Sequence, residues 1–441
     1  MKKLLGAFGT ITMTGSGMTG IIGNAPVTPK NEINYSQIQD ENLPILKRIK
    51  RQNSQEINIL EKIKVVIRTE GIVYSSGAVF NNKLYFGSSE RDHNVYEYDP
   101  VTGRQKIVIR TNGQIFSSGT TLNNKLYIGS NDHNVYEYDP VTEQKKIIIR
   151  TEGKVYSSGV VFNNKVYFGS FDNNVYEYDP VTEQQKIVII TNGDVWSAGI
   201  VLNNKLYFGS WDHNVYEYDP ATQQQKIVIK TGGEVFSSGL TLNNKIYFGS
   251  GDKNVYEYDP STEQQKIVIK SKWRLVSSGV VLNNKLYFGS WDHNVYEYDP
   301  STKQQKIVII TMSNVNSSGV AFNNKVYFGS NDNNVYEYDP ATGQQKIVII
   351  TKGSVQSSGI VLNNKVYFGS IDNNVYEYSN YYDLEQINNN SDTTILNELN
   401  YLNPDLNISQ LEIINKTKNS VILKIKNNLN DNNNIKTKTL I

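Results

Sequence analysis

The sequence contains no cysteine among its 441 residues. Without thiols the chain forms no disulfide, no thiolate metal site and no nucleophilic cysteine. A lipid anchor attached through a cysteine is excluded for the same reason. The absence leaves the compartment open, because an exported protein with a large core is stable without disulfides.

The chain also lacks an excess of charge of either sign. Its 44 Lys and Arg residues nearly balance 43 Asp and Glu residues, for a formal net charge of +1. A nucleic-acid-binding protein usually carries a basic stripe. The short basic run at Lys47–Arg51 is more typical of a solvated face. We therefore expect no nucleic-acid partner.

Long apolar runs are missing beyond the N-terminal region, so no later segment predicts a membrane span. At the N-terminus, Lys2 and Lys3 precede an uncharged stretch from Leu4 to Ile22, and Gly23-Asn24-Ala25 offers small residues for cleavage. This order is typical of an export signal. We predict that residues 1–25 are a signal peptide or membrane leader and that the protein is secreted or held on the cell surface. A disordered cytosolic leader is the alternative.

Repetition is what the chain has in abundance. The eighteen residues NNKLYFGSWDHNVYEYDP occupy positions 203–220 and return unchanged at 283–300. A Ser-Ser-Gly or Ser-Ala-Gly marker divides the chain into eight units, the first interval being 42 residues and the others 40. The marker begins at Ser75, Ser117, Ser157, Ser197, Ser237, Ser277, Ser317 and Ser357. A period of this length indicates a repeat architecture.

Within a unit the apolar pattern has period two, which predicts strands. Segments rich in Val, Ile, Tyr and Phe lie at Lys205–Ser210, Asn214–Asp219, Lys226–Lys230 and Val235–Leu242. Asn-Asn, Asp-Asn and Asp-Pro pairs separate them, as expected of turns. Four short strands in 40 residues are typical of one blade of a β-propeller.

The segment GSWDHNVYEYDPATQQQKIVI (Gly209–Ile229) resembles the repeat of pyrroloquinoline-quinone (PQQ)-type propellers. Asp219 and Thr222 match the Asp and Thr of that repeat, whereas Glu217 and Ile227 stand where the family has Ala and Trp. The resemblance runs from residue 62 to residue 378. It implies that the Ser-Ser-Gly strand is innermost in each blade and that Ile and Tyr replace Trp in packing between blades.

The eighth unit ends after its third strand, at Tyr378, and lacks an outermost strand. An unpartnered KIKVVIR stands before the first unit, at Lys62–Arg68. We infer that this N-terminal strand completes the last blade, which closes the ring and removes an open edge. The predicted fold is an all-β, eight-bladed β-propeller of four-stranded blades over residues 62–378.

The segments flanking the propeller differ from it in composition. We interpret residues 26–61 as a linker. Residues 379–441 form an Asn-rich C-terminal tail in which Leu411–Ile414 and Val421–Ile425 alternate in polarity. We expect a small β element there and a disordered last dozen residues.

The eight units differ from one another in two connections that share one face. One is the turn between the second and third strands, where Phe171, Trp211, Trp291 and Ile371 are expected at exposed tips. The other is the residue just before the Ser-Ser-Gly marker, occupied among others by Tyr74, Phe116, Tyr156, Trp196 and Phe236. These five either pack between neighbouring innermost strands or join the tips in a binding face. Exposed aromatic side chains supply contact area for proteins and stacking area for sugars.

Residues that carry catalysis or bind metal are not gathered by the repeat. His93, His133, His213 and His293 occupy one position in four different units, so we interpret them as turn residues and expect no metal. Glu217 recurs in every unit, which indicates a structural role. Near-identical blades yield rings of equal residues rather than the unlike groups that an enzyme site or a quinone cofactor requires.

The sequence therefore supports three hypotheses of function. The first is an exported, non-enzymatic binding module that holds a protein or glycan on its variable face, for example in adhesion. The second follows from the resemblance and is a scaffold similar to the non-catalytic PQQ-repeat proteins of envelope assembly. The third, least favoured, is a PQQ-dependent oxidoreductase. We expect no cofactor and no catalytic residue.

Overall fold

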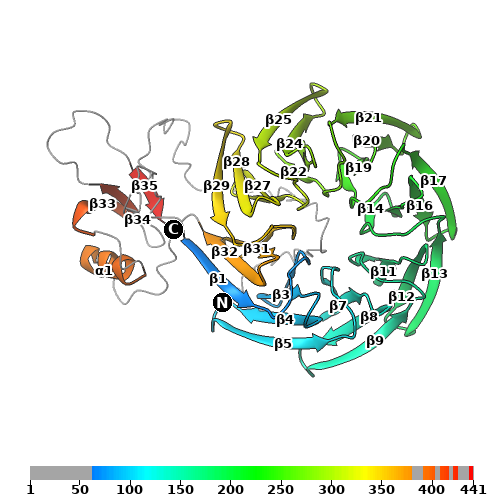
Figure 1. The fold of residues 1–441 in the computed structure, drawn as a ribbon, viewed down its shortest axis with the longest axis horizontal. Helices are drawn as coiled ribbons and strands as arrows, with labels where there is room; N and C mark the ends of the chain where they lie inside the picture. The colour runs from blue at the N-terminus through cyan, green and yellow to red at the C-terminus, as the bar shows by residue number, and fades with distance from the viewer. Residues whose placement is uncertain (1–61, 380–390, 403–407, 417–420, 426–436, 441) are drawn as a thin grey trace, which may run out of the picture. The chain divides into compact units, whose positions relative to one another are not determined.

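The computed structural model describes residues 62–379, 391–402, 408–416, 421–425 and 437–440. Within 62–379, eight four-stranded antiparallel sheets are arranged in a ring (Figure 1). This is the eight-bladed β-propeller that the repeats predict. We number the blades 1 to 8 in chain order and call their strands inner, second, third and outer.

The strands recur at equivalent positions in every blade. The inner strands are β2 (Ala78–Phe80), β6 (Thr120–Leu122), β10 (Val160–Phe162), β14 (Ile200–Leu202), β18 (Leu240–Leu242), β22 (Val280–Leu282), β26 (Val320–Phe322) and β30 (Ile360–Leu362). The second strands are β3 (Lys83–Gly87), β7 (Lys125–Ser130), β11 (Lys165–Gly169), β15 (Lys205–Gly209), β19 (Lys245–Gly249), β23 (Lys285–Gly289), β27 (Lys325–Gly329) and β31 (Lys365–Ser370). The third strands are β4 (Asn94–Asp99), β8 (Asn134–Asp139), β12 (Asn174–Asp179), β16 (Asn214–Asp219), β20 (Asn254–Asp259), β24 (Asn294–Asp299), β28 (Asn334–Asp339) and β32 (Asn374–Ser379). The outer strands are β5 (Arg104–Arg110), β9 (Gln144–Arg150), β13 (Gln184–Ile190), β17 (Gln224–Lys230), β21 (Gln264–Lys270), β25 (Gln304–Ile310), β29 (Gln344–Ile350) and, in blade 8, β1 (Lys62–Arg68).

The ring closes through β1, as the sequence predicts. Blade 8 has the strand order β1-β32-β31-β30, and the Thr69 N–H donates to the Asn373 carbonyl oxygen at 2.9 Å. Gln105 of blade 1 accepts a bond from the Arg68 N–H at 2.9 Å and donates one to the Arg68 carbonyl oxygen at 2.8 Å. Gln185 makes the same pair of bonds to Arg150 between blades 2 and 3. The closing seam is therefore bonded like an ordinary blade junction, and its outer edge is covered.

The inner strands are shorter than predicted. Residues Val235–Gly239 were expected to belong to the inner strand, but β18 begins only at Leu240. The Ser237 hydroxyl donates to the Gly249 carbonyl oxygen at 3.0 Å and accepts from the Gly249 N–H at 2.8 Å. A side chain thus takes the place of the main-chain ladder at this point, so the segment pairs without being a regular strand.

A second set of serines joins the blades at their inner ends. The Ser238 N–H donates to the Ser278 hydroxyl of the next blade at 2.8 Å, and across the seam the Ser358 N–H donates to Ser76 at 2.9 Å. Blade 4 carries Ala198 at this position, which has no hydroxyl to accept such a bond.

The core lies between the blades. In the cluster shared by blades 4 and 5, Ile229 of β17 packs with Tyr256 and Phe248 of the next blade. Ile and Tyr therefore pack between the blades, but Ile227, the residue expected to take the place of Trp, is 41% exposed, and the buried Ile is Ile229. Gly239 allows a close approach of the blades, because a Cβ there would lie 2.4 Å from the Phe248 ring.

The residues from Tyr378 onward belong to a second compact unit. It contains α1 (Asp392–Leu402), the 3-10 helix η2 (Ile408–Gln410) and a three-stranded sheet of β33 (Leu411–Lys416), β34 (Val421–Ile425) and β35 (Thr437–Leu440). The β33–β34 pair matches the predicted β element. The expectation of disorder in the last dozen residues is wrong for β35, which pairs with β34 through Val421 and Leu440.

The predicted leader (1–25) and linker (26–61) lie outside the described residues. Among the residues that are described, no helix has the length and apolar character needed to cross a bilayer.

Candidate functional site: the variable face

One face of the propeller repeats the same turns in every blade, and we call it the constant face. It is formed by the inner-to-second and third-to-outer connections, which lie at the same end of an antiparallel blade. In blade 4, Asn203 and Asn204 take φ values of 52° and 60°, a left-handed backbone that Asn tolerates well. The Asp219 Oδ1 accepts from the Ala221 N–H at 2.9 Å. These recurring residues serve backbone geometry.

The opposite face, which we call the variable face, presents three changing residues from each blade. One lies in the loop before the inner strand, one at the tip of the second-to-third turn and one just before the Ser-Ser-Gly marker. In blade 4 these are Asp194, Trp211 and Trp196, and the Trp211 N–H donates to the Asp194 carbonyl oxygen at 2.9 Å. Sequence reasoning found the second and third positions but missed the first. Its signal was a charge that changes sign between repeats, positive at Lys154 and Arg274 and negative at Asp194 and Glu234.

Seven rings on the variable face form one continuous cluster across blades 1 to 5, which we call the aromatic crescent. Its members are Tyr74, Phe116, Tyr156, Phe171, Trp196, Trp211 and Phe236. Neighbouring ring centroids lie between 4.4 and 6.0 Å apart. Trp196 and Trp211 are stacked at 5.7 Å with an interplanar angle of 27°. These separations are those of favourable aromatic pairs.

Every ring of the crescent is half-buried. The residues before the marker pack against rings of neighbouring blades and keep an exposed portion. The tips Phe171 and Trp211 are less exposed than the sequence led us to expect, since they lean on the same rings. Mutual packing fixes the side chains before any partner arrives, which lowers the entropic cost of binding.

The crescent ends at a charged pair rather than at another ring. The Arg274 guanidinium lies 6.0 Å from the Phe236 ring centroid and 5.9 Å from that of Trp291. Its Nη1 is 3.7 Å from the Glu234 Oε2. Because Gly251 places no side chain at the tip of blade 5, Trp291 is connected to the crescent through Arg274.

Blade 7 has polar residues at the tip and before the marker, and blade 8 has one before the marker. The Asn316 amide donates to the Asn331 side-chain oxygen at 3.4 Å, and Gln356 stands where blades 1 to 5 have aromatic residues. The variable face is therefore asymmetric, with aromatic side chains on one part of the ring and amides on another.

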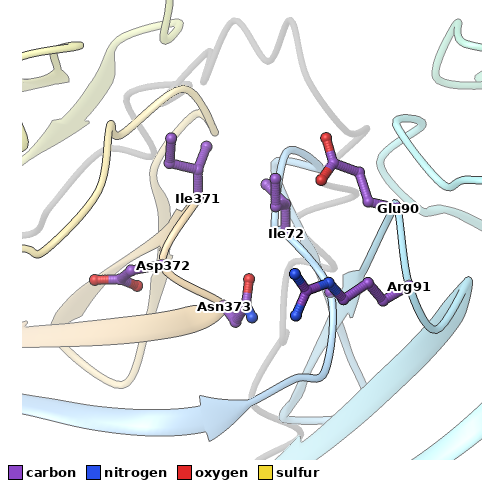
Figure 2. Close-up of a pocket in the computed structure, with 7 residues that line it drawn as sticks. Ile72, Glu90, Arg91, Ile371, Asp372 and Asn373 are labelled. Atoms are coloured by element: carbon purple, nitrogen blue, oxygen red, sulfur yellow. The ribbon is translucent and has the colours of Figure 1, made fainter.

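Ile371, predicted to belong to the binding face, lies apart from the crescent at the seam between blades 8 and 1. It lines a cavity of about 240 Å³ with Ile72, Asn373 and the two inserted residues Glu90 and Arg91. Figure 2 shows the Arg91 side chain extending toward Asn373 across this cavity. The insertion in the first repeat thus marks the seam on the variable face.

Two exposed apolar residues of the variable face were missed by sequence reasoning. Trp273 is 61% exposed and Met312 is 84% exposed, and both lie in loops that lead into inner strands. Trp273 stands where the other blades have Gly or Ser, which was the available signal. With Trp273 included, all four tryptophans of the protein are on this face.

The turns between second and third strands, four of which contain Asp-His, have a structural role on this face. In blade 5 the Asp252 Oδ2 accepts from the Tyr256 hydroxyl and from the Gly232 N–H, both at 2.6 Å. Burial, followed by the hydrogen bond to Asp252, raises the pKa of Tyr256 to about 12. His213 takes a left-handed φ of 71° as a turn residue. In the described ranges no three His, Asp or Glu side chains gather in a way that could hold a metal ion.

The recurring Glu is a buried element of the blade. The Glu217 Oε1 accepts from the Lys205 ammonium at 2.6 Å, and its Oε2 accepts from the Tyr207 hydroxyl at 3.0 Å. Glu217 is only 4% exposed, so the pairing joins the second and third strands inside the blade rather than at its surface.

No protein-family model matches the chain, and no curated protein sequence is significantly similar to it. Solved structures do match. The computationally designed Ika8 protein aligns with a TM-score of 0.58 at 19% identity, covering 71% of this chain and 99% of its own. BamB from Moraxella catarrhalis also has a TM-score of 0.58, at 14% identity, covering 72% of this chain and 100% of its own. At these identities the likeness shows the fold alone, and the chain is an eight-bladed β-propeller similar to these two proteins.

Proposed function

We propose that the protein is a non-enzymatic binding module that holds a protein partner on its variable face. The observation that carries the proposal is the aromatic crescent, in which seven half-buried rings contact one another in stacked, tilted and T-shaped pairs on one face. β-Propellers commonly bind proteins. Aromatic residues fixed by their neighbours are the kind that dominate binding energy at protein interfaces.

The proposal excludes catalysis on physical grounds. The buried carboxylates, such as Glu217, recur in every blade and are already paired with Lys. The variable face offers rings and amides in place of an acid, a base and an orienting group set around one point. Addition of PQQ with calcium ions should leave the absorption spectrum of the quinone unchanged, and a spectral shift with turnover of an alcohol would count against the proposal.

A glycan is the second candidate, because the Trp196 and Trp211 rings have the area that sugars stack on. A protein partner is preferred, since the crescent also joins charged groups, Glu234 and Arg274, that suit a peptide surface. We further propose that the chain is exported and that its blades are diverged PQQ-type repeats. The alternative function is a scaffold that joins several partners.

The decisive experiment compares the two faces. The variant Trp196→Ala/Trp211→Ala removes the centre of the crescent, and the matched control Val141→Ala/Val181→Ala trims side chains that are 76% and 78% exposed on the constant face. Immobilised full-length chains are incubated with extract and culture medium of the producing cells, and captured proteins are quantified by mass spectrometry. Partners held by the wild type and the control should be lost from the crescent variant. Equal capture by all three chains would overturn the proposal.

Export has its own test. N-terminal sequencing of the protein recovered from the culture medium or cell surface should begin after Ala25. Recovery of the protein only from the cytosol, with Met1 or Lys2 at its N-terminus, would contradict this part of the proposal.

A further inference from the structure

The loop before each inner strand has one position on the variable face where the sign of the charge differs between blades. Blades 3 to 6 carry Lys154, Asp194, Glu234 and Arg274 there. The two cations both face aromatic rings, since Lys154 Nζ lies 6.0 Å from the Tyr156 centroid and Arg274 stands over Phe236. The rings of this face therefore already attract cations from the chain itself.

The pair of blades 5 and 6 shows how such a cation is held. The Arg274 guanidinium lies over two rings, Phe236 and Trp291, with its Nη1 3.7 Å from the Glu234 carboxylate. A carboxylate at this loop position, together with the neighbouring rings, thus binds one guanidinium group.

One blade earlier a related arrangement lacks its cation. Asp194 occupies the position of Glu234 and Trp196 that of Phe236. The tip equivalent to Trp291 is Gly251, and the second ring is instead Trp211 of the same blade, which stacks on Trp196. Within the described residues the Asp194 carboxylate has no hydrogen bond and no ion pair, and burial followed by the charge of Asp172 raises the pKa of Asp194. The position that supplies Arg274 in the next pair is here Glu234, a second acid.

We propose that the variable face binds a cationic side chain of its partner, a guanidinium or ammonium group, at the Asp194 carboxylate beside the rings of Trp196 and Trp211. This inference rests on the proposed function and specifies the chemistry of the partner. A cation at this place relieves the repulsion between Asp194 and Asp172 and gains contact with two rings, so its interaction is favourable on both counts.

A basic side chain fits the site better than a metal ion. A hard metal ion needs several oxygen ligands that converge on one point. Asp172 is not available as a second ligand, because its carboxylate already accepts hydrogen bonds from the Tyr176 hydroxyl and the Glu152 N–H. Aromatic faces favour the flat, weakly hydrated guanidinium in particular.

The test uses Nα-acetylargininamide as the probe, with Nα-acetylcitrullinamide as its neutral analogue of the same shape. Since all four tryptophans lie on the variable face, Trp fluorescence of the full-length protein reports binding. We expect saturable binding of the arginine probe at concentrations on the order of millimolar, at least fivefold weaker binding of the citrulline probe, and loss of affinity for the arginine probe as salt is raised. Equal affinities for the two probes, or no saturable response to either, would overturn the inference.

Two variants locate the effect. Asp194→Asn should weaken binding of the arginine probe about five- to tenfold, because it removes the charge and keeps the shape. Glu183→Gln removes one negative charge from the constant face and should leave affinity unchanged. Equal weakening in both variants, or none in Asp194→Asn, refutes a site at Asp194.

The outcome is separable from that of the proposed function. If partners are captured through Trp196 and Trp211 but Asp194→Asn captures them equally well at all salt concentrations, the binding module stands and its preference for a basic side chain fails. If the probe binds at Asp194 but no partner is lost from the crescent variant, the site stands and the proposed function fails.

Discussion

The two faces of this propeller are made by the same eight repeats, yet they treat sequence change differently. On the constant face every blade keeps the Asn-Asn turn, and blades 1 to 7 keep the Asp that caps the turn after the third strand. On the variable face the three positions of each blade range from Trp and Phe to Asn, Gln and Gly. Residues that a left-handed backbone or a buried position requires recur in the repeats. The differences between repeats lie at positions without such a requirement. Substitutions in the two sets should therefore differ in kind, with loss of stability in one and loss of binding in the other.

The largest loss is expected in the framework at the seam. Ile67 of β1 is fully buried, whereas Ile63 of the same strand is 48% exposed. Ile67→Asp buries an unpaired carboxylate and should lower the free energy of unfolding by about 3–5 kcal/mol. Ile63→Asp should change it by less than about 0.5 kcal/mol. Urea denaturation measures both, and a small effect of Ile67→Asp would show that β1 does not close the ring.

The next largest loss concerns the recurring buried Glu. Burial alone would raise the pKa of the Glu257 carboxyl, but hydrogen bonds from Lys245 at 2.7 Å and Lys266 at 2.9 Å outweigh it and lower the pKa. Glu257→Gln should therefore cost about 1–3 kcal/mol near pH 7. A lowered pKa stabilises the folded state above the ordinary Glu pKa, about 4.3, so the difference should fade as the pH falls below that value.

Denaturation curves of the wild type and Glu257→Gln from pH 7 to pH 3 check this dependence. A gap that persists unchanged to the lowest pH would contradict the ion pair as its source. Glu263→Gln, which removes an exposed partner of Lys226, is the matched control and should have the smaller effect at every pH.

On the variable face the losses of stability should be smaller and should follow ring contacts. Trp211→Ala removes contacts with Trp196, Phe171 and Phe236 and should cost about 1–2 kcal/mol. Trp273→Ala, at a side chain 61% exposed, should cost less than about 0.5 kcal/mol. Thermal or urea unfolding distinguishes them, and equal effects would mean that the crescent is not packed as described.

The smallest effect is a gain. Ala198→Ser supplies the hydroxyl that seven other blades have at this position and should raise the free energy of unfolding by about 0.5–1.5 kcal/mol. The reverse change, Ser238→Ala, removes the acceptor of the Ala198 N–H and should destabilise. A loss of stability in Ala198→Ser would show that the inner ends of blades 3 and 4 leave no room for the hydroxyl.

Much of the fold follows from the repeats alone. The marker counts the blades, the alternation of Tyr and Val in Asn214–Asp219 gives the strands, and the unpaired KIKVVIR before the first unit gives the closure. The inner strand was drawn too long, because the Ser237 hydroxyl replaces ladder bonds that a pattern of apolar residues cannot distinguish from regular pairing.

The site was predictable only in part. The positions of Trp196 and Trp211 follow from comparing repeats. The contacts of Trp196 with Tyr156 and Phe236 depend on how neighbouring blades are rotated, which no single unit of the sequence encodes. Asp194 and Trp273 went unnoticed because they lie in loops whose other residues recur between repeats. A single substitution in such a loop has no evident meaning in the sequence until the structure places it beside the rings. Ile371 was predicted to belong to the binding face because its position in the repeat is equivalent to that of Trp211. It lies in blade 8, at the seam with blade 1, and so is away from the crescent.

The most direct test of the variable face as the binding surface is photo-crosslinking from one exposed position on each face. A photoreactive phenylalanine replaces Trp273 on the variable face or Val181 on the constant face, two side chains that are 61% and 78% exposed. After capture of the partner and irradiation, a covalent adduct should form from position 273 and not from position 181. An adduct from position 181 alone would contradict the account.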